Sequence, residues 1–375
     1  MKKLFPSIVA IAIISLQAIS QPVNNQSGRK VQVAILFDTS NSMDGLIDQA
    51  KTRIWSIINE LSSLRFLGQT PLIEIALYDY GNSGLTAGSG YIRQQIALTT
   101  DLDVISAKLF GLSTNGGDEF CGAVIQKSMQ ELAWSNSPLD LKIIYIAGNE
   151  PFNQGTVAYK EVCNTAASKN IYVNTIYCGN HAQGIAEFWR DCATISKGDY
   201  FNIDSDQTVV QIATPYDNDI NQYNDSLNKT YYGYGSLGNS KKINQIQEDA
   251  NAESQSPSSK TERSIVKSKE VYSNASWDII DAVDKEGKDI TKMAEDELPI
   301  EFKGKTAEEK TALIEEKKKE RTLYQEKINT LAKNRQDFIA EEMKKQADGV
   351  KKDDFGTSVN ESLLKKATEL GYNKE

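Results

Sequence analysis

The sequence predicts an α/β protein with a doubly wound, mainly parallel sheet, followed by a polar linker and an α-helical C-terminal region. Short and nearly continuous apolar runs, typical of strands buried on both faces, recur through the first half of the chain. Amphipathic segments long enough for helices separate these runs. Strands that alternate with helices in this way form parallel sheets, because a crossover helix connects neighbouring parallel strands.

Residues 29–110 alternate twice between strand and helix. The run VQVAILF is apolar at almost every position, and apolar residues at three- and four-residue spacing follow it. A second apolar run comes after Pro71, and a glycine-rich segment then turns the chain into a third strand before a short helix. These elements are expected at residues 31–37, 44–64, 72–78, 91–98 and 102–109.

The following residues continue the alternation through three more helices and three more strands. They are expected at residues 120–132, 141–147, 157–167, 171–177, 185–193 and 200–203. A further helix at residues 217–228 is expected to pack on the sheet and end the domain. Ligands bind such sheets at the carboxyl ends of the strands, so the loops after Phe37, Leu109 and Ile146 are the first to inspect.

The composition changes after about residue 216. From residue 218 to residue 260, 18 of 43 residues are Asn, Gln or Ser. The segment therefore has too few apolar side chains to offset the conformational entropy that is lost on ordering. We therefore expect the α/β domain at residues 29–215, extended by its terminal helix to about residue 230. A flexible polar linker is expected at residues 231–260, and a charged α-helical region at residues 261–375.

In the C-terminal region, the spacing of apolar and charged residues predicts a long helix between residues 305 and 345, with shorter helices at residues 277–283 and 359–370. The long helix has one apolar stripe and a solvated, charged remainder. This stripe suggests self-association through the C-terminal helices, as in a coiled coil. Its members are Tyr324, Ile328, Leu331, Phe338 and Ile339.

The N-terminus predicts a signal peptide over residues 1–20. Lys2 and Lys3 precede a short apolar run, and small residues lie at the −3 and −1 positions of a cleavage site after Ser20. The alternative is an uncleaved anchor, although the run of about a dozen residues is short for a membrane span. No second segment is long and apolar enough to cross a membrane, so we expect a secreted or periplasmic protein, with a composition that suits a bacterial envelope.

Charge and histidine content exclude several classes of function. The chain has 42 basic and 51 acidic residues, a formal charge of −9, which becomes −11 once the two lysines of the signal are removed. Neither this balance nor the mixed signs of the tail favours binding to nucleic acid. The single histidine, His181, excludes a multi-histidine metal site.

Export makes disulfides possible among the four cysteines, Cys121, Cys163, Cys178 and Cys192. Three pairings can be drawn, and the sequence does not choose among them or exclude buried free thiols.

The most informative segment is Asp38-Thr39-Ser40-Asn41-Ser42-Met43, between the first strand and the first helix. One carboxylate and two hydroxyl groups at alternating positions can converge above the strand end, and such oxygens are ligands for Mg²⁺ or Ca²⁺. The alternative is a degenerate site whose Ser and Asp side chains only cap the next helix.

This segment resembles the DxSxS signature that begins the metal-ion-dependent adhesion site of von Willebrand factor A domains. Residues 112–123, with a Gly-Gly pair before a helix, resemble the second loop of that family, and residues 143–150 resemble its fourth strand and third loop. The resemblance covers about residues 29–215 and implies a Rossmann-like fold with a divalent cation at the strand ends, Mg²⁺ first, with Ca²⁺ or Mn²⁺ as alternatives.

Two positions depart from the family pattern. The threonine that usually follows the Gly-Gly pair is replaced by Asp118, unless Thr114 reaches in, and the aspartate of the third loop is replaced by Gly148. Glu150 is then expected to supply the missing carboxylate. The resemblance therefore implies a variant site whose metal ligands are Asp38, Ser40, Ser42, Asp118 and Glu150.

In the family, the open position of the metal accepts a carboxylate from a partner protein. We therefore expect metal-dependent protein binding or adhesion through an acidic side chain of the partner. The first alternative is a structural envelope scaffold with a degenerate metal site that assembles through its helical tail. A metal-assisted hydrolase is the less favoured alternative, because no phosphate-binding glycine loop of the GxxxxGK or GxGxxG type opens a helix; we expect no enzyme.

Overall fold

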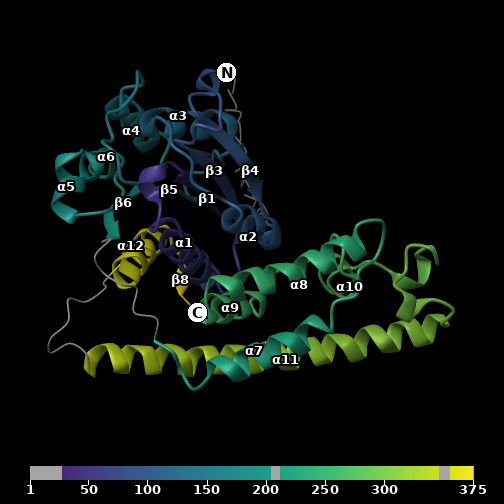
Figure 1. Ribbon diagram of the computed structural model, residues 1–375. Helices are drawn as coiled ribbons and strands as arrows, with labels where there is room; N and C mark the ends of the chain where they lie inside the picture. The colour runs from purple at the N-terminus through teal and green to yellow at the C-terminus, as the bar shows by residue number, and fades with distance from the viewer. Residues whose placement is uncertain (1–27, 204–211, 346–354, 375) are drawn as a thin grey trace, which may run out of the picture.

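The computed structural model describes residues 28–203, 212–345 and 355–374. The expected signal peptide, residues 1–20, lies outside the described residues. The centre of the molecule is a six-stranded sheet in the order β4-β3-β1-β5-β6-β7, in which only β3 and β4 pair antiparallel (Figure 1). The strands are β1 (Lys30–Asp38), β3 (Leu72–Tyr80), β4 (Ile92–Thr99), β5 (Leu141–Gly148), β6 (Tyr172–Cys178) and β7 (Tyr200–Ile203). The predicted α/β class with a mainly parallel sheet is therefore confirmed.

Helices cover both faces of this sheet, which explains why its central strands are apolar on both sides. Val33, Ile35 and Phe37 of β1 belong to the core that includes α1, whereas Ala34 and Leu36 belong to the core on the side of α3 and α4. In Figure 1 the latter two helices lie on the opposite side of the sheet from α1. The helices of this domain are α1 (Ile47–Leu61), α2 (Leu102–Phe110), α3 (Cys121–Glu131), α4 (Tyr159–Ser168), α5 (His181–Ala186) and α6 (Trp189–Ile195).

The single helix expected at residues 185–193 is instead the junction of two helices. α5 ends near Ala186, and α6 begins at Trp189 after Phe188, whose φ of 71° is in the left-handed region. A left-handed residue ends a helix, although glycine usually occupies that position. The disulfide between Cys163 and Cys192 ties α6 to α4, while Cys121 and Cys178 are buried free thiols.

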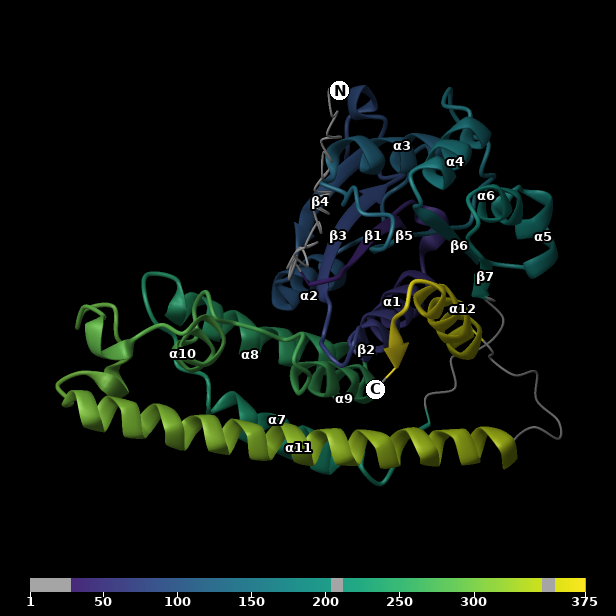
Figure 2. The same ribbon diagram turned by 180° about the vertical axis from the view of Figure 1, so that it is seen from behind.

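The helical region follows β7 in the chain and lies beside the sheet domain in both views (Figures 1 and 2). Its helices are α7 (Asp217–Asn228), α8 (Gly238–Gln255), α9 (Pro257–Lys267), α10 (Ile279–Glu286) and α11 (Ala307–Lys345). α7 forms where a helix was predicted, but its main contacts are with α11 and α9 rather than with the sheet. None of the helices in the described part of the chain is both long and apolar enough to cross a membrane.

Residues 231–260 are not a flexible linker in the structure, because α8 and the start of α9 occupy most of them. The prediction was wrong because it counted only apolar side chains. Polar and charged residues anchor these helices: Arg263 of α9 lies 2.6 Å from Asp103 of α2 and 2.8 Å from Asp249 of α8, and all three side chains are buried. Paired buried charges therefore hold the helical region against the sheet domain.

The apolar stripe of α11 packs within the molecule. Ile328 is fully buried, Tyr324 and Leu331 pack against the same core, and the rings of Phe338 and Tyr216 lie 6.4 Å apart. The stripe is therefore not free for the self-association expected of it.

The last helix, α12 (Phe355–Glu369), returns to the sheet domain and packs against α1 and β7. The short strand β8 (Asn373–Lys374) after it pairs with β2 (Leu64–Arg65). Val359, Leu363 and Tyr372 are buried in the same core as β1. The sheet domain is thus built from two separate stretches of chain, and residues 212–345 lie between them in the sequence.

Candidate metal centre

The candidate site lies at the carboxyl end of β1, in the middle of the sheet. β1 runs between β3 and β5, so its last residue, Asp38, pairs in register with Tyr80 and emerges beside the end of β5. Thr39 continues this attachment, because its backbone N–H donates to the carbonyl oxygen of Tyr80 at 2.9 Å. The short helix Asn41–Met43 follows directly and leads into α1. The parallel pairing therefore fixes the position of the predicted loop.

The Asp38 carboxylate is buried, and only Oδ1 has a donor at hydrogen-bonding distance and angle, although the Ser40 hydroxyl and the Asn149 backbone also interact with the carboxylate. Oδ1 accepts from the backbone N–H of Ser40 at 2.8 Å. Oδ2 is buried and has no hydrogen-bond partner. A buried carboxylate oxygen without a donor is costly unless a cation or water satisfies it. This oxygen is the strongest sign of a ligand at the strand end.

The two predicted serines lie together beside this carboxylate. The hydroxyl oxygens of Ser40 and Ser42 are 2.8 Å apart, and the Ser42 hydroxyl donates to Oδ1 of Asn149 at 2.8 Å. The Asn149 amide nitrogen donates in return to the Ser42 carbonyl oxygen at 2.8 Å. These reciprocal bonds clamp the loop after β1 to the loop after β5. Asn149 was not among the predicted site residues, although it directly follows β5, a strand that neighbours β1.

The carboxylate that joins Asp38 from the second loop is Glu119, not the expected Asp118. Glu119 is 8% exposed. Besides burial, the charge of Asp38 raises the pKa of Glu119 and a hydrogen bond with the Ser40 hydroxyl lowers it, so this carboxylate lies beside both residues. Asp118 is exposed at the surface. Adjacent residues before a helix point in different directions, so only one of the two can face the site. Thr114, the other alternative for this loop, bonds to Asp44 at the surface.

Glu150 lies at the edge of the site and is partly buried. Its backbone carbonyl oxygen accepts a hydrogen bond from the indole nitrogen of Trp189 at 2.8 Å, which fixes the chain after β5. Its carboxylate is close enough to raise the pKa of both Asp38 and Glu119. Glu150 is therefore near the predicted site, in the outer part of it.

Glycine is required at position 148, where the family pattern has aspartate. A Cβ atom there would lie 2.6 Å from the Tyr80 hydroxyl oxygen and 3.0 Å from Oδ2 of Asp38. No side chain fits this space without displacing the tyrosine or the carboxylate. The third loop therefore contributes backbone, Asn149 and Glu150 to this region, and no aspartate.

The electrostatics of the site favour a cation. Burial, above all, raises the pKa of Asp38 from 3.8 to about 7, with a further contribution from the charge of Glu150. Burial followed by the charges of Asp38 and Glu150 raises the pKa of Glu119 from 4.5 to about 7. The charged neighbours that act most strongly on both groups are acidic. A bound cation would supply the missing positive charge and keep both carboxylates ionised.

The donor set fits a hard divalent cation. The hydroxyl oxygens of Ser40 and Ser42 are in contact, and the Ser40 hydroxyl also acts on the carboxylates of Asp38 and Glu119; oxygens of this kind suit Mg²⁺, Ca²⁺ or Mn²⁺. Within the described part of the chain, no three His, Cys, Asp or Glu side chains form a group that could hold a metal ion by themselves. A cation here would therefore depend on the serine hydroxyls and on water.

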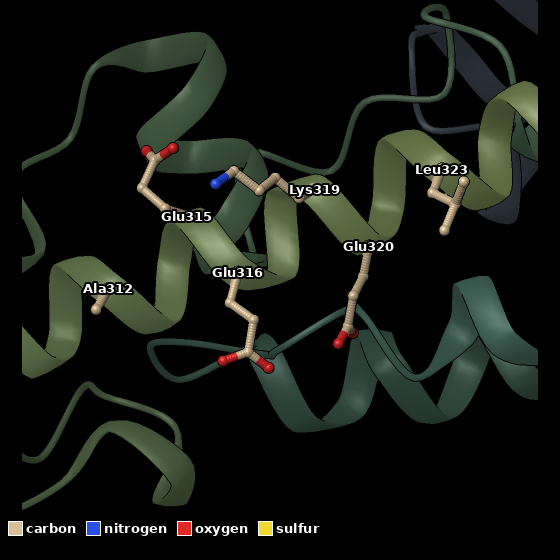
Figure 3. Close-up of a pocket in the computed structure, with 6 residues that line it drawn as sticks. All are labelled: Ala312, Glu315, Glu316, Lys319, Glu320 and Leu323. Carbon is tan, nitrogen blue, oxygen red and sulfur yellow. The ribbon is translucent and has the colours of Figure 1, made fainter.

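The hollows on the helical region do not compete with this site. One of about 560 Å³ lies along α11 and is lined by Ala312, Glu315, Glu316, Lys319, Glu320 and Leu323 (Figure 3). In Figure 3 Glu315 and Lys319 point to one side of the helix, and Glu316 and Glu320 point to the other. Their polar groups do not converge on a common point, as those of a binding site do.

Comparisons with known proteins give similarity over less than half of this chain. It is similar to a conserved hypothetical protein, BatB, from Bacteroides thetaiotaomicron, with 18% identity and a TM-score of 0.35 over 46% of this chain and 90% of that one. It is similar to the VWA domain of SpRpn10, with 16% identity and a TM-score of 0.37 over 48% of this chain and 90% of that one. It is also similar to a von Willebrand factor type A protein from Catenulispora acidiphila, with 15% identity and a TM-score of 0.35 over 47% of this chain and 39% of that one. No protein-family model and no curated protein matches the chain.

Proposed function

We propose that this chain is an exported protein of the von Willebrand factor A type, which binds a protein partner through a divalent cation. Asp38, Ser40 and Ser42 would hold the cation, with Glu119 in the place expected for Asp118. When bound, the cation would attract an oxygen ligand from the partner, such as an acidic side chain. The chain's own contribution is to hold the oxygens in place through the clamp between Ser42 and Asn149.

The observation that carries this proposal is the unpartnered Oδ2 of Asp38. A protein that kept Asp38 only as a helix cap would satisfy its oxygens with backbone N–H groups. Here Oδ1 accepts from a backbone N–H in this way, whereas Oδ2 has no donor at hydrogen-bonding distance and angle, although the Asn149 backbone interacts with the carboxylate. Burial of a charged group without a partner is costly, so a cation is the simplest reason for an aspartate at this position.

A test is calorimetric titration of the chain without its expected signal peptide, residues 21–375, with Mg²⁺, Mn²⁺ and Ca²⁺. We expect heat with at least one cation and loss of that heat in Asp38→Ala. Glu119→Gln should weaken binding, whereas the matched control Asp118→Asn, at an exposed position, should bind as the wild type does. The proposal fails if no cation gives heat and none changes the melting temperature of the wild type.

A structural scaffold is the second candidate, and the firm attachment of the helical region to the sheet domain favours it. In that case the partner would bind equally well with and without a chelator. Pull-down from native envelopes with and without chelator distinguishes the two candidates. We expect no catalytic turnover, and phosphatase and peptidase assays with added Mg²⁺ would test this.

A further inference from the structure

A lysine, an asparagine and an aspartate meet inside the helical region. Asn228 is the last residue of α7, Asp249 lies in α8 and Lys267 is the last residue of α9. The Lys267 side-chain nitrogen, Nζ, donates to Oδ1 of Asn228 and to Oδ2 of Asp249, both at 2.6 Å. The Asn228 amide nitrogen, Nδ2, donates to the same Oδ2 at 2.8 Å. The amine, the amide and the carboxylate thus form a closed triangle of hydrogen bonds.

This triangle is shielded from water. The side chain of Lys267 is fully buried and that of Asp249 is 9% exposed. Leu227 and Val266, which precede Asn228 and Lys267 in the chain, are both buried. Burial of an amine beside an amide keeps water from competing in a reaction between the two groups.

We propose that Lys267 and Asn228 join covalently through an amide bond between the lysine Nζ and the asparagine Cγ. The Nζ–Cγ bond forms and the Cγ–Nδ2 bond breaks. Nζ gives up two of its three protons, and the leaving nitrogen takes both and departs as ammonium. Asp249, which contacts both nitrogens, carries the protons between them and is unchanged at the end. The step needs no oxidant and no further reactant.

The distances within the triangle favour this step. Nζ lies 2.6 Å from Oδ1 of Asn228. Because a carbonyl bond is about 1.2 Å long, Nζ is at most about 3.8 Å from Cγ. Bond formation starts from separations of roughly 3 to 3.5 Å, so a small movement of the lysine side chain is enough.

The charges around the triangle favour a nucleophilic amine. Burial, above all, and the charge of Arg263 lower the pKa of Lys267, against the opposing charge of Asp249. A lysine amine attacks only after it has lost its proton, and burial is one of the ways in which proteins activate it. Burial raises the pKa of Asp249, but the charges of Lys267 and Arg263 hold it well below its ordinary value. The carboxylate is therefore ionised and can accept the proton.

A second asparagine beside the same carboxylate provides an internal comparison. Asn224 lies one turn before Asn228 on α7, and its amide nitrogen also donates to Oδ2 of Asp249 at 2.8 Å. Its carbonyl oxygen, however, is buried and has no hydrogen-bond partner, so Lys267 does not donate to it. We therefore expect the lysine to react with Asn228 and not with Asn224.

The bond would tie the end of α7 to the end of α9, across 39 residues of the sequence. Both helices pack against α11. A covalent link that closes a loop restricts the unfolded chain, as a disulfide does, so the bond would stabilise the helical region.

Peptide mapping of residues 21–375 by mass spectrometry tests the proposal. Trypsin should release residues 198–229 joined to residues 264–269, because it no longer cleaves after the modified Lys267. This branched peptide should be lighter by one ammonia than its two parts together. The intact mass does not decide alone, since Gln21 at the N-terminus can also lose ammonia. Recovery of residues 264–267 as an unmodified peptide in full yield, with no branched peptide, overturns the proposal.

Variants identify the reacting groups. Asn228→Ala and Lys267→Arg should give linear peptides only, whereas the matched control Asn224→Ala should give the branched peptide as the wild type does. Asp249→Asn should form the bond about a hundredfold more slowly, measured as the branched fraction against time after refolding. A branched peptide that persists in Lys267→Arg, or that is lost in a folded Asn224→Ala, shows that the assignment is wrong. Urea unfolding identifies any variant that has lost its fold.

Discussion

Replacing Asp38 by asparagine should stabilise the cation-free protein at neutral and alkaline pH. The pKa of Asp38 is raised by burial from 3.8 to about 7, so the folded state holds the proton more tightly than the unfolded state. The free energy of unfolding therefore falls as the pH rises from about 4 to about 7. Asparagine has the shape of the protonated aspartate and does not ionise.

The size of the effect follows from the two pKa values. Each tenfold difference in a protonation equilibrium corresponds to about 1.4 kcal/mol, so the ionised Asp38 lowers the free energy of unfolding by about 4 kcal/mol at pH 8 and about 2 kcal/mol at pH 5. Asp38→Asn should recover these amounts. A divalent cation at a hundred times its dissociation constant should stabilise the wild type by about 2.7 kcal/mol at pH 8 and leave the variant unchanged.

Urea unfolding at pH 5 and pH 8, with chelator and with cation, measures all of these differences. Comparing variant with wild type at each pH cancels the titration of other groups. Asp118→Asn is the control and should stay within about 0.5 kcal/mol of the wild type at both pH values, since its side chain is exposed. The reasoning is refuted if Asp38→Asn is less stable than the wild type at pH 8 in chelator, or if the difference between them does not grow with pH.

Three further predictions rest on other parts of the structure. Cation affinity should fall as the pH is lowered from 8 to 6, because Asp38 and Glu119, both with pKa values raised to about 7, take up protons; calorimetry at the two pH values measures this. Replacing Cys163 and Cys192 by serine should lower the free energy of unfolding by about 3.5 kcal/mol for a loop of 29 residues, as measured by urea unfolding, and reductant should have the same effect on the wild type. Arg263→Ala leaves two buried carboxylates without their guanidinium partner and should cost about 3 to 5 kcal/mol in the same assay.

The sheet was predictable because its strands are marked locally. β1, β5 and β6 are buried on both faces, so their sequences are apolar runs that differ from the helices around them. The break between α5 and α6 was not predictable in this way, because the residue in the left-handed conformation is Phe188, and neither it nor the residues on either side of it is glycine or proline. Tertiary contacts hold it there: its ring lies 5.9 Å from that of Tyr159, and the next residue, Trp189, is fully buried.

The residues of the candidate site also fall into two groups, those that a local motif predicts and those that only the tertiary structure brings to the site. The group Asp38, Ser40 and Ser42 is a short motif that the sequence displays directly. The choice between Asp118 and Glu119 depends on which of two neighbours turns toward the sheet, and single-sequence patterns do not encode this. Asn149 joins the site across 107 residues of chain, so only the strand order could have indicated it.

The return of α12 to the sheet is the least local feature of the fold, and its contribution to stability can be measured. Leu363 is fully buried in the core that contains β1, whereas the neighbouring Lys365 is exposed. If α12 is a true part of the sheet domain, Leu363→Ala should lower the free energy of unfolding by about 2 to 5 kcal/mol, and Lys365→Ala should change it by less than about 0.5 kcal/mol. A chain that ends at residue 345 keeps the helices between β7 and α12, and it lacks α12 and the strand β8 that pairs with β2. It should unfold at clearly lower urea concentration than the full chain, since each large buried side chain that it lacks contributes about 1.5 to 3 kcal/mol. Equal urea midpoints for the two chains would show that the sheet does not need α12, and the sheet domain would then end near residue 203.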